Sequence, residues 1–214
     1  KNELLCTSLC HIAEGSKGYF YWLWNPLREG PNAGAWSIRE IDGSANDKSR
    51  ILAELGKMIA ANNDLLYSVK PADIYVAIFD SMDAAIYLAR RSEYHPLSEW
   101  YVKNQYGFYK ALRKVQMGCD FVDETALFNG TINNYDCIYV PFSMTMEKNV
   151  ADALKNYVYQ GGTIIVDCMT AFTPREHNPY LQQPGAGMQE VLGIKALGFE
   201  LAYDGWTEIK NIKK

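Results

Sequence analysis

The first 62 residues combine helical and strand-like patterns of apolar residues. Residues 4–14 carry apolar side chains at helical spacing and predict a helix. Residues 19–24, Tyr-Phe-Tyr-Trp-Leu-Trp, are apolar throughout and predict a buried strand. A loop rich in Gly and Pro, residues 25–43, follows, and within it residues 35–41 predict a short strand. The next helix is capped by Ser44 or Asn46 and has the apolar positions Ile51, Leu52, Leu55, Met58 and Ile59.

Beyond residue 71 the pattern changes to strands that are apolar on both faces and that alternate with long helices. The predicted strands are residues 73–79, 119–122, 135–141 and 163–167. The predicted helices are residues 97–116, 147–160 and 188–192. This alternation indicates βαβ units and therefore a flavodoxin-like α/β domain, whose parallel sheet has helices on both faces. We place a first domain at residues 1–68, a second at 69–199, and a following segment or linker at 200–214.

Charge and composition exclude several classes of function. The net charge is -4 and the Lys and Arg residues are scattered along the chain, which argues against a nucleic-acid groove. No apolar stretch approaches the roughly 20 residues that span a bilayer. The five cysteines and three histidines lack the spacing of a zinc site, so we expect no metal. The compartment stays open: a cytoplasmic location is favoured, and a periplasmic one is the alternative.

Cofactor binding and catalysis by the second domain alone are also disfavoured. Residues 79–83, after the first predicted strand, contain no glycine and carry two acids that would repel a phosphate, so we expect no flavin or nucleotide. Cys168 ends a strand and His177 follows it, as a nucleophile and base might be arranged in an amidotransferase. The Gly-x-Cys-x-Gly turn that bends such a backbone is missing around Cys168.

The order of these features resembles glycoside hydrolase family 42, the β-galactosidases. In the first domain the resemblance rests on the aromatic run, on Trp-x-Pro-x-Arg at residues 24–28, on Asp42-Gly43, and on Glu-Leu-Gly at residues 54–56. In the second domain it rests on residues 108–112 followed by 119–122, on residues 157–166 with their Gly-Gly-Thr turn, and on 184–185 leading to 191–194. The resemblance extends over residues 3–199.

This resemblance implies that the chain is the C-terminal part of a larger retaining glycoside hydrolase. Residues 1–68 would be the last strand and helix of its TIM-barrel catalytic domain, and residues 69–199 a trimerisation domain that resembles class I glutamine amidotransferases. The parent would then be a homotrimer that hydrolyses terminal glycosidic bonds of a carbohydrate. Its two catalytic carboxylates would lie on earlier barrel strands, so we expect no catalytic residue in this chain.

The resemblance also suggests three substrate-binding residues, Trp24, Arg28 and Asn32. The Trp24 ring could stack on a sugar or pack between barrel and helices, and Arg28 could shape the site or clamp its own loop. Aligned on these two residues, the Glu and His that hold galactose in the family correspond to Asn32 and Ala35. Asn32 can bond a hydroxyl and Ala35 cannot, so the parent is a β-galactosidase or a relative that acts on another glycoside. Glu29 either contacts the sugar or is a solvated loop charge.

Two segments after the first strand of the second domain are unusually apolar for a monomer. Residues 84–88, expected to be a loop, and the segment of residues 94–100 should expose apolar area that either forms an interface between subunits or packs against the barrel. The alternative interpretation of the whole chain is a flavodoxin-like or amidotransferase-like binding module without hydrolase activity. Such a module does not require the strand, loop and helix of residues 1–62, and these favour the hydrolase.

Overall fold

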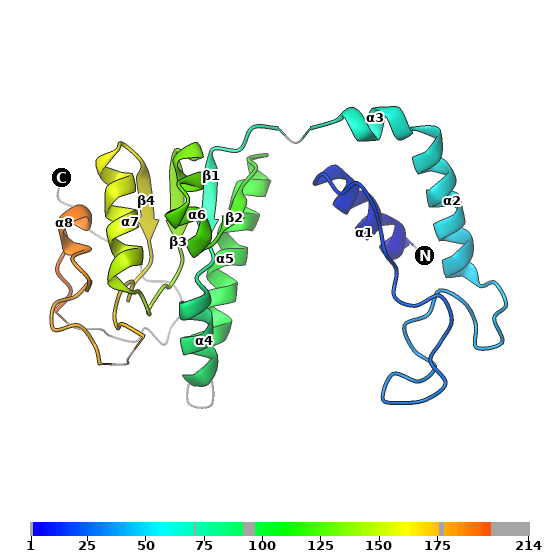
Figure 1. Ribbon diagram of the computed structural model, residues 1–214, viewed down its shortest axis with the longest axis horizontal. Helices are drawn as coiled ribbons and strands as arrows, with labels where there is room; N and C mark the ends of the chain where they lie inside the picture. Colours follow the sequence, from blue (N-terminus) through cyan, green and yellow to red (C-terminus); the bar gives the residue numbers. More distant parts are fainter. Residues whose placement is uncertain (1, 71, 92–96, 176–177, 198–214) are drawn as a thin grey trace. The chain divides into compact units, whose positions relative to one another are not determined.

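The chain folds as two compact units joined by a short connection. The structure, a computed structural model, describes residues 2–70, 72–91, 97–175 and 178–197. The backbone contacts divide the chain into two units, Lys1–Ala72 and Asp73–Lys214 (Figure 1). Each unit has its own buried residues.

The first unit contains three helices. They are α1 Asn2–Ala13, α2 Asp47–Ala61 and α3 Asn63–Ser68. The first two confirm the predicted helices, and α3 was not predicted because its six residues are too few to show a period. Asn46 is the N-cap of α2: its side chain accepts from the Ser49 backbone, and the Ser49 hydroxyl accepts from the Asn46 backbone. This reciprocal pairing satisfies two donors at the start of the helix.

The two strands that the sequence predicts for the first unit, at residues 19–24 and 35–41, are not formed. A strand needs a neighbour that pairs along its length. In the described part of the chain only the end of residues 19–24 finds one: the Leu23 amide donates to the Trp36 carbonyl at 2.8 Å, and the Ile38 amide donates to the Leu23 carbonyl at 2.8 Å. The aromatic run is also not buried, because Phe20 is 104% and Trp22 is 72% exposed.

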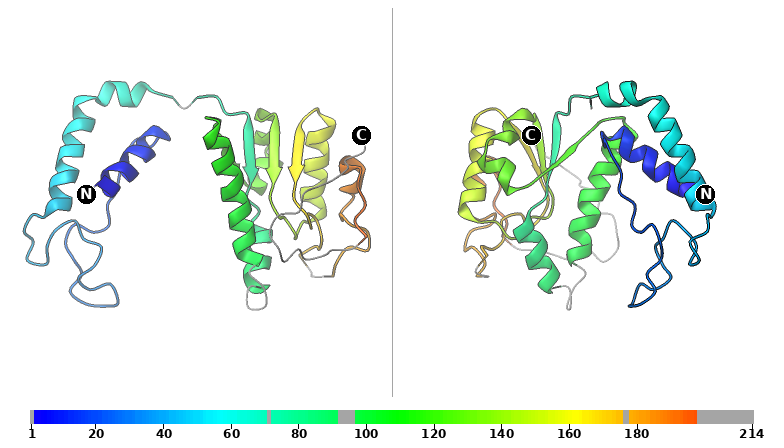
Figure 2. Two further views of the ribbon diagram at one scale, coloured as in Figure 1. Left: turned by 180° about the vertical axis from the view of Figure 1, so that it is seen from behind. Right: turned by 45° about the vertical axis from the view of Figure 1, so that its right-hand side comes forward.

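The second unit confirms the predicted α/β fold. Its strands are β1 Val76–Phe79, β2 Asp120–Val122, β3 Cys137–Val140 and β4 Thr163–Val166. They form one sheet in the order β2-β1-β3-β4, and every pairing is parallel. Parallel neighbours need crossover connections, and helices supply them here (Figure 2). The four strands lie where the sequence places them, with ends that differ by at most three residues.

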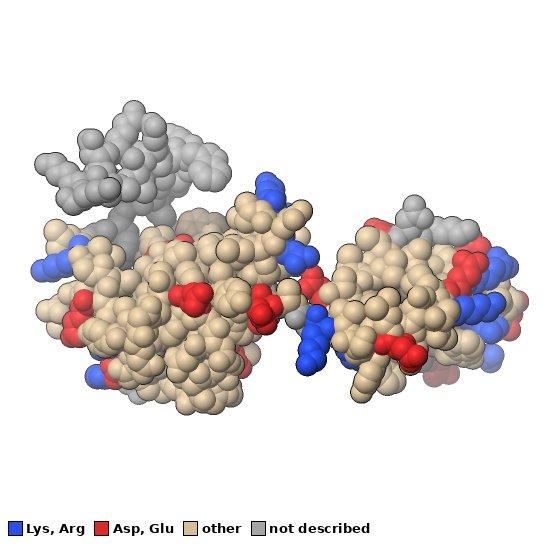
Figure 3. All heavy atoms as spheres, turned by 90° about the horizontal axis from the view of Figure 1, so that it is seen from above, with Lys and Arg blue, Asp and Glu red and all other residues tan. Residues whose placement is uncertain are grey.

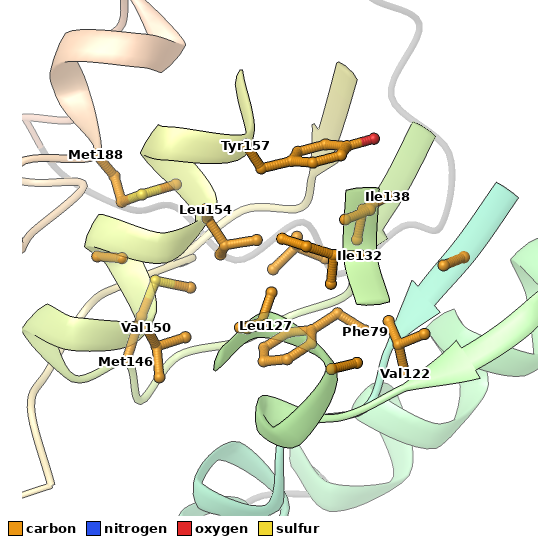
Figure 4. Packing of buried hydrophobic residues seen from close by; sticks show 14 of the residues in the cluster. Phe79, Val122, Leu127, Ile132, Ile138, Met146, Val150, Leu154, Tyr157 and Met188 are labelled. Atoms are coloured by element: carbon orange, nitrogen blue, oxygen red, sulfur yellow. The ribbon is translucent and has the colours of Figure 1, made fainter. Parts of the chain in front are cut away.

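Helices cover both faces of the sheet, as predicted. They are α4 Met82–Arg91, α5 Leu97–Lys114, α6 Glu124–Phe128, α7 Lys148–Tyr159 and α8 Gln189–Leu192, with the short 3-10 helix η1 Thr131–Asn134. The sequence predicted α5, α7 and α8 and missed the other three. On one face, the sheet residues Phe79 and Ile138 pack against Leu154 of α7 and residues of α6 (Figure 4). On the other face, the Phe108 ring of α5 stacks on Tyr139 at 4.2 Å.

The segment predicted as an exposed apolar loop at residues 84–88 is instead part of helix α4. Ala84 and Leu88 are fully buried against Tyr101 and Phe142, and only Ile86 of the apolar residues is exposed, at 47%. The helical period explains the difference, because it turns positions 84 and 88 toward the core while 86 points outward. Of the second apolar segment, residues 94–96 lie outside the described residues.

Candidate functional site

The predicted sugar-stacking residue Trp24 is paired with a residue that the sequence did not single out, Arg39. The Arg39 guanidinium carbon lies 4.7 Å from the centre of the Trp24 ring, and the Arg39 amide donates to the Trp24 carbonyl at 3.2 Å. Arg39 also donates to the carbonyl of Gly43 at 3.0 Å. The Arg39 cation covers part of the Trp24 indole. The residue remains 59% exposed, so the rest of the ring is open to solvent.

One nitrogen of this arginine is unusual. Arg39 Nε is buried and has no hydrogen-bond partner among the described residues. Buried donors are nearly always paired, so an orphan of this kind calls for an acceptor that the described residues do not supply. The guanidinium is held by the Gly43 carbonyl and the Trp24 ring, while its Nε bonds to no described residue.

The other two predicted substrate-binding residues, Arg28 and Asn32, lie on the exposed loop that follows Trp24. The loop closes on itself through backbone bonds from Gly34 to the Leu27 carbonyl, 2.9 Å, and from Ala35 to the Asn32 carbonyl, 3.2 Å. No side-chain hydrogen bond or ring contact joins Trp24, Arg28 and Asn32 in the described part of the chain. The three side chains therefore lie along one segment of the chain, with no hydrogen bond or ring contact that holds them together in its described part.

The loop of residues 25–43 also carries three carboxylates. Glu29, Glu40 and Asp42 are all exposed. Hydrogen bonds from Ser44 lower the pKa of Asp42, since the side chain accepts from the Ser44 amide at 2.8 Å. A glycosidase acid needs a raised pKa, which requires an apolar or like-charged environment.

The aromatic run itself has two different faces. Tyr19, Tyr21 and Leu23 are half-buried, whereas Phe20, Trp22 and Trp24 between them are exposed. The inner face is anchored to α1: the Tyr19 hydroxyl donates to the Ser8 carbonyl, and the Ser8 and Tyr21 hydroxyls are 2.8 Å apart. This alternation is the period of a β-strand, with one face on the helices and the other presenting large aromatic rings outward. The Trp22-Leu23 peptide is cis.

In the second unit, the carboxyl ends of the strands carry polar groups that bond to one another. Asp80, just after β1, accepts from the Tyr101 hydroxyl at 3.1 Å and from the Gln105 amide at 2.9 Å. The Ser81 hydroxyl donates to Glu124 at 2.8 Å. Burial, and then the nearby Asp80 carboxylate, raise the pKa of Tyr101, so this hydroxyl stays protonated and serves as a donor.

Asp167 at the end of β4 is held in the same way. Its Oδ2 accepts from the Tyr139 hydroxyl at 2.7 Å, from the Asn104 amide at 2.9 Å and from the Phe142 backbone at 3.2 Å. Cys168 is exposed, but partial desolvation of its thiol, and then the Asp167 charge, raise its pKa, which lowers the share of reactive thiolate. His177 lies outside the described residues. At this edge of the sheet, where α/β proteins usually bind ligands, Asp80 and Asp167 are thus held by hydrogen bonds from neighbouring residues.

Two classes of site find no support in the described ranges. Among residues 2–70, 72–91, 97–175 and 178–197, no three His, Cys, Asp or Glu side chains gather as metal ligands would. Within those same ranges, no helix has the length and apolarity needed to span a bilayer. On the face seen in Figure 3, acidic and basic side chains are interspersed among uncharged ones.

Known proteins that are similar to this chain include two β-galactosidases. The β-galactosidase BgaH of Haloferax lucentense is 26% identical over 171 residues, which cover 79% of this chain and 23% of that protein. The β-galactosidase LacZ of Heyndrickxia coagulans is 23% identical over 186 residues, which cover 85% of this chain and 26% of that protein. The chain therefore spans about a quarter of the length of these curated relatives.

Solved structures show the same fold. The β-galactosidase of Bacillus circulans sp. alkalophilus superposes with a TM-score of 0.78 at 20% identity, over 94% of this chain and 29% of that one. The β-galactosidase of Rahnella sp. R3 gives a TM-score of 0.71 at 20% identity, over 89% of this chain and 27% of that one. Residues 74–212 match the family described as the β-galactosidase trimerisation domain, which is more than half of the chain. The chain belongs to this family.

Proposed function

We propose that the chain is the C-terminal part of a retaining glycoside hydrolase and that its main role there is assembly. The observation that carries the proposal is the family match of residues 74–212, together with relatives named β-galactosidases that are about four times as long. The second unit, from about residue 69 to 199, would be the non-catalytic trimerisation domain. Residues 200–214 would begin a following segment.

The first unit, residues 1–68, would close the catalytic barrel of that hydrolase. Support comes from the outward face of Phe20, Trp22 and Trp24, which the described residues leave exposed although large aromatic rings gain free energy on burial. The neighbouring strand and the barrel interior of the parent would cover these rings. The backbone of residues 19–22, unpaired in the described part, would then pair as the last barrel strand.

The substrate-binding residues of this chain would be Trp24, Arg28 and Asn32. Trp24 is the last residue of the aromatic run, at the end that would open on the barrel mouth. Its exposed ring would stack on the C-H face of a sugar. Arg28 and Asn32 would offer donors to hydroxyls from the loop.

The test uses the full-length protein and the 214-residue chain side by side. The full-length protein should hydrolyse a nitrophenyl glycoside and should scatter light as a trimer at micromolar concentration. The shorter chain should not hydrolyse it, because it lacks the two carboxylates. Release of nitrophenol by the shorter chain, or a full-length monomer with full activity, would contradict the proposal.

The sugar itself is tested with a panel of nitrophenyl β-glycosides. A β-galactosidase prefers galactoside, whereas a relative with another specificity prefers a different sugar, as the substitution of the family's Glu and His by Asn32 and Ala35 would allow. For the nitrophenyl glycoside of the preferred sugar, Trp24→Leu should raise KM, because the Trp24 indole contributes to substrate binding. An unchanged KM would assign Trp24 to packing.

A further inference from the structure

The outer surface of the second unit carries two adjoining hollows between α6 and α7. One has a volume of about 490 Å³ and the other about 570 Å³. Phe128 and Asn149 line both of them, so the two hollows adjoin at these residues. We call the pair the α6–α7 groove. Each volume lies within the range of about 300–1,000 Å³ that is usual for small-molecule pockets.

Carboxamide side chains line the first hollow. Asn149, Asn156 and Gln160 follow one another along one face of α7 and its C-cap, at spacings that a helix brings to the same side. Asn133 faces them from η1. The side chains of Asn133, Asn156 and Gln160 make no hydrogen bond to any described residue. Each carboxamide presents two donors and an acceptor, which match a hydroxyl that both donates and accepts.

The Phe128 side chain supplies the apolar contact. It is 55% exposed although its neighbour Leu127 is buried in the core below. An exposed aromatic ring where two polar hollows meet is suited to the C-H face of a pyranose, because that face is apolar while the rim of the sugar ring carries hydroxyls. The groove therefore combines an exposed aromatic ring with carboxamides whose side chains bond to no described residue.

The second hollow ends in planar charged groups. Arg175 donates to both oxygens of Asp83, at 3.1 and 2.7 Å, and Glu147 accepts from the Arg175 backbone at 2.5 Å. Glu124 lines the same hollow. Three carboxylates therefore face two cations, Lys148 and Arg175, and an anionic ligand would meet net repulsion.

We propose that the α6–α7 groove binds a neutral oligosaccharide, with the Phe128 ring stacked on one sugar and the carboxamides of α7 bonded to the next. A phosphate or acidic polymer is disfavoured by the carboxylates. An apolar helix is disfavoured as well, because it would bury the carboxamides without hydrogen-bond partners. This inference does not rest on the proposed hydrolase function, because the groove lies wholly within the second unit and needs no barrel.

The experiment is saturation-transfer NMR of the full chain with lactose or cellobiose at millimolar concentration. The sugar protons should gain signal from the protein, and Phe128→Ala and Asn156→Ala should each weaken binding, by about tenfold for the ring. Tyr159→Ala is the matched control, because Tyr159 is a 66% exposed aromatic residue of α7 that does not line the groove. This control should bind as strongly as the unchanged protein.

Three outcomes would overturn the proposal. The first is no transfer to either sugar from the unchanged protein. The second is equal binding by Phe128→Ala, Asn156→Ala and Tyr159→Ala, which places the sugar elsewhere. The third is dissociation of an oligomer by Phe128→Ala, which would assign the groove to a contact between subunits. A circular dichroism melt of each variant ensures that a lost signal reflects a lost contact and not an unfolded chain.

Discussion

The Arg39 guanidinium carbon lies 4.7 Å from the centre of the Trp24 ring, and the two residues are also joined through their backbones. A cation over an exposed indole is worth about 0.5–1 kcal/mol. We therefore predict that Arg39→Met and Trp24→Leu are coupled: in a double-mutant cycle of urea unfolding, the interaction energy should be about 0.5–1 kcal/mol.

The control for this cycle is Arg39→Lys, which keeps a cation and loses the planar stack. It should retain part of the coupling with Trp24, since lysine also interacts with aromatic faces. Strictly additive effects of Arg39→Met and Trp24→Leu would show that the two side chains are neighbours without a stabilising contact.

A second prediction concerns Gly162 in the Gly-Gly-Thr turn. A methyl group at Gly162 would lie 2.2 Å from a carbon of the Tyr157 ring, far inside van der Waals contact. The ring cannot move freely, because its hydroxyl donates to the Tyr135 carbonyl at 2.8 Å. Gly162→Ala should therefore lower the free energy of unfolding by about 1–3 kcal/mol, measured by urea denaturation.

Gly107 provides the matched control within the same unit. It lies inside helix α5, and a methyl group there would meet nothing within 4 Å. Gly107→Ala should raise the free energy of unfolding by about 0.5–1 kcal/mol, because alanine favours the helix. If both substitutions shifted stability in the same direction, close packing of Tyr157 on Gly162 would not be the cause.

The sheet was predictable because its strands are short runs of residues that are apolar on both faces, as in residues 76–79 and 137–140. Helices α5 and α7 were predictable because each repeats its apolar positions over three turns or more. Helix α6 was not, since five residues cannot show a period. Helix α4 was read as a loop because its apolar residues are consecutive and hide the helical spacing.

The candidate site was only partly predictable, for a different reason. Trp24 stands out as the end of an aromatic run, and the loop after it can be read from its Pro and Gly residues. Arg39 gives no such signal, because its position on the Trp24 ring depends on how a 14-residue loop closes. The aromatic run failed as a strand since strand formation depends on a partner that the sequence of the segment does not contain.

A third prediction concerns pH. Burial, and then the hydrogen bond to Asp120, raise the pKa of Tyr135 to about 12, above the ordinary value of 10.0. The folded state thus holds this proton more tightly than the unfolded state. The stabilisation is complete below pH 10 and is lost as the pH rises from about 10 to about 12. The free energy of unfolding should fall across this window in urea titrations.

Other groups also titrate there, so the test compares the protein with Tyr135→Phe. The variant lacks the hydroxyl that bonds Asp120 at 2.9 Å, and its stability should fall less steeply above pH 10. Parallel curves for the two proteins between pH 10 and 12 would contradict the assignment.

The last prediction separates two residues of helix α4 that the sequence places in one apolar segment. Leu88 is fully buried and packs with Tyr101 and Phe142, whereas Ile86 is 47% exposed. Leu88→Ala removes buried methyl groups and leaves a cavity, so it should lower the free energy of unfolding by about 2–5 kcal/mol. Ile86→Ala should change it by less than about 1 kcal/mol, since much of that side chain is already in water. Urea unfolding of the two variants measures the difference. Comparable losses would mean that Ile86 is buried in solution, and hence that this face of α4 is covered by another part of the protein or by a second copy.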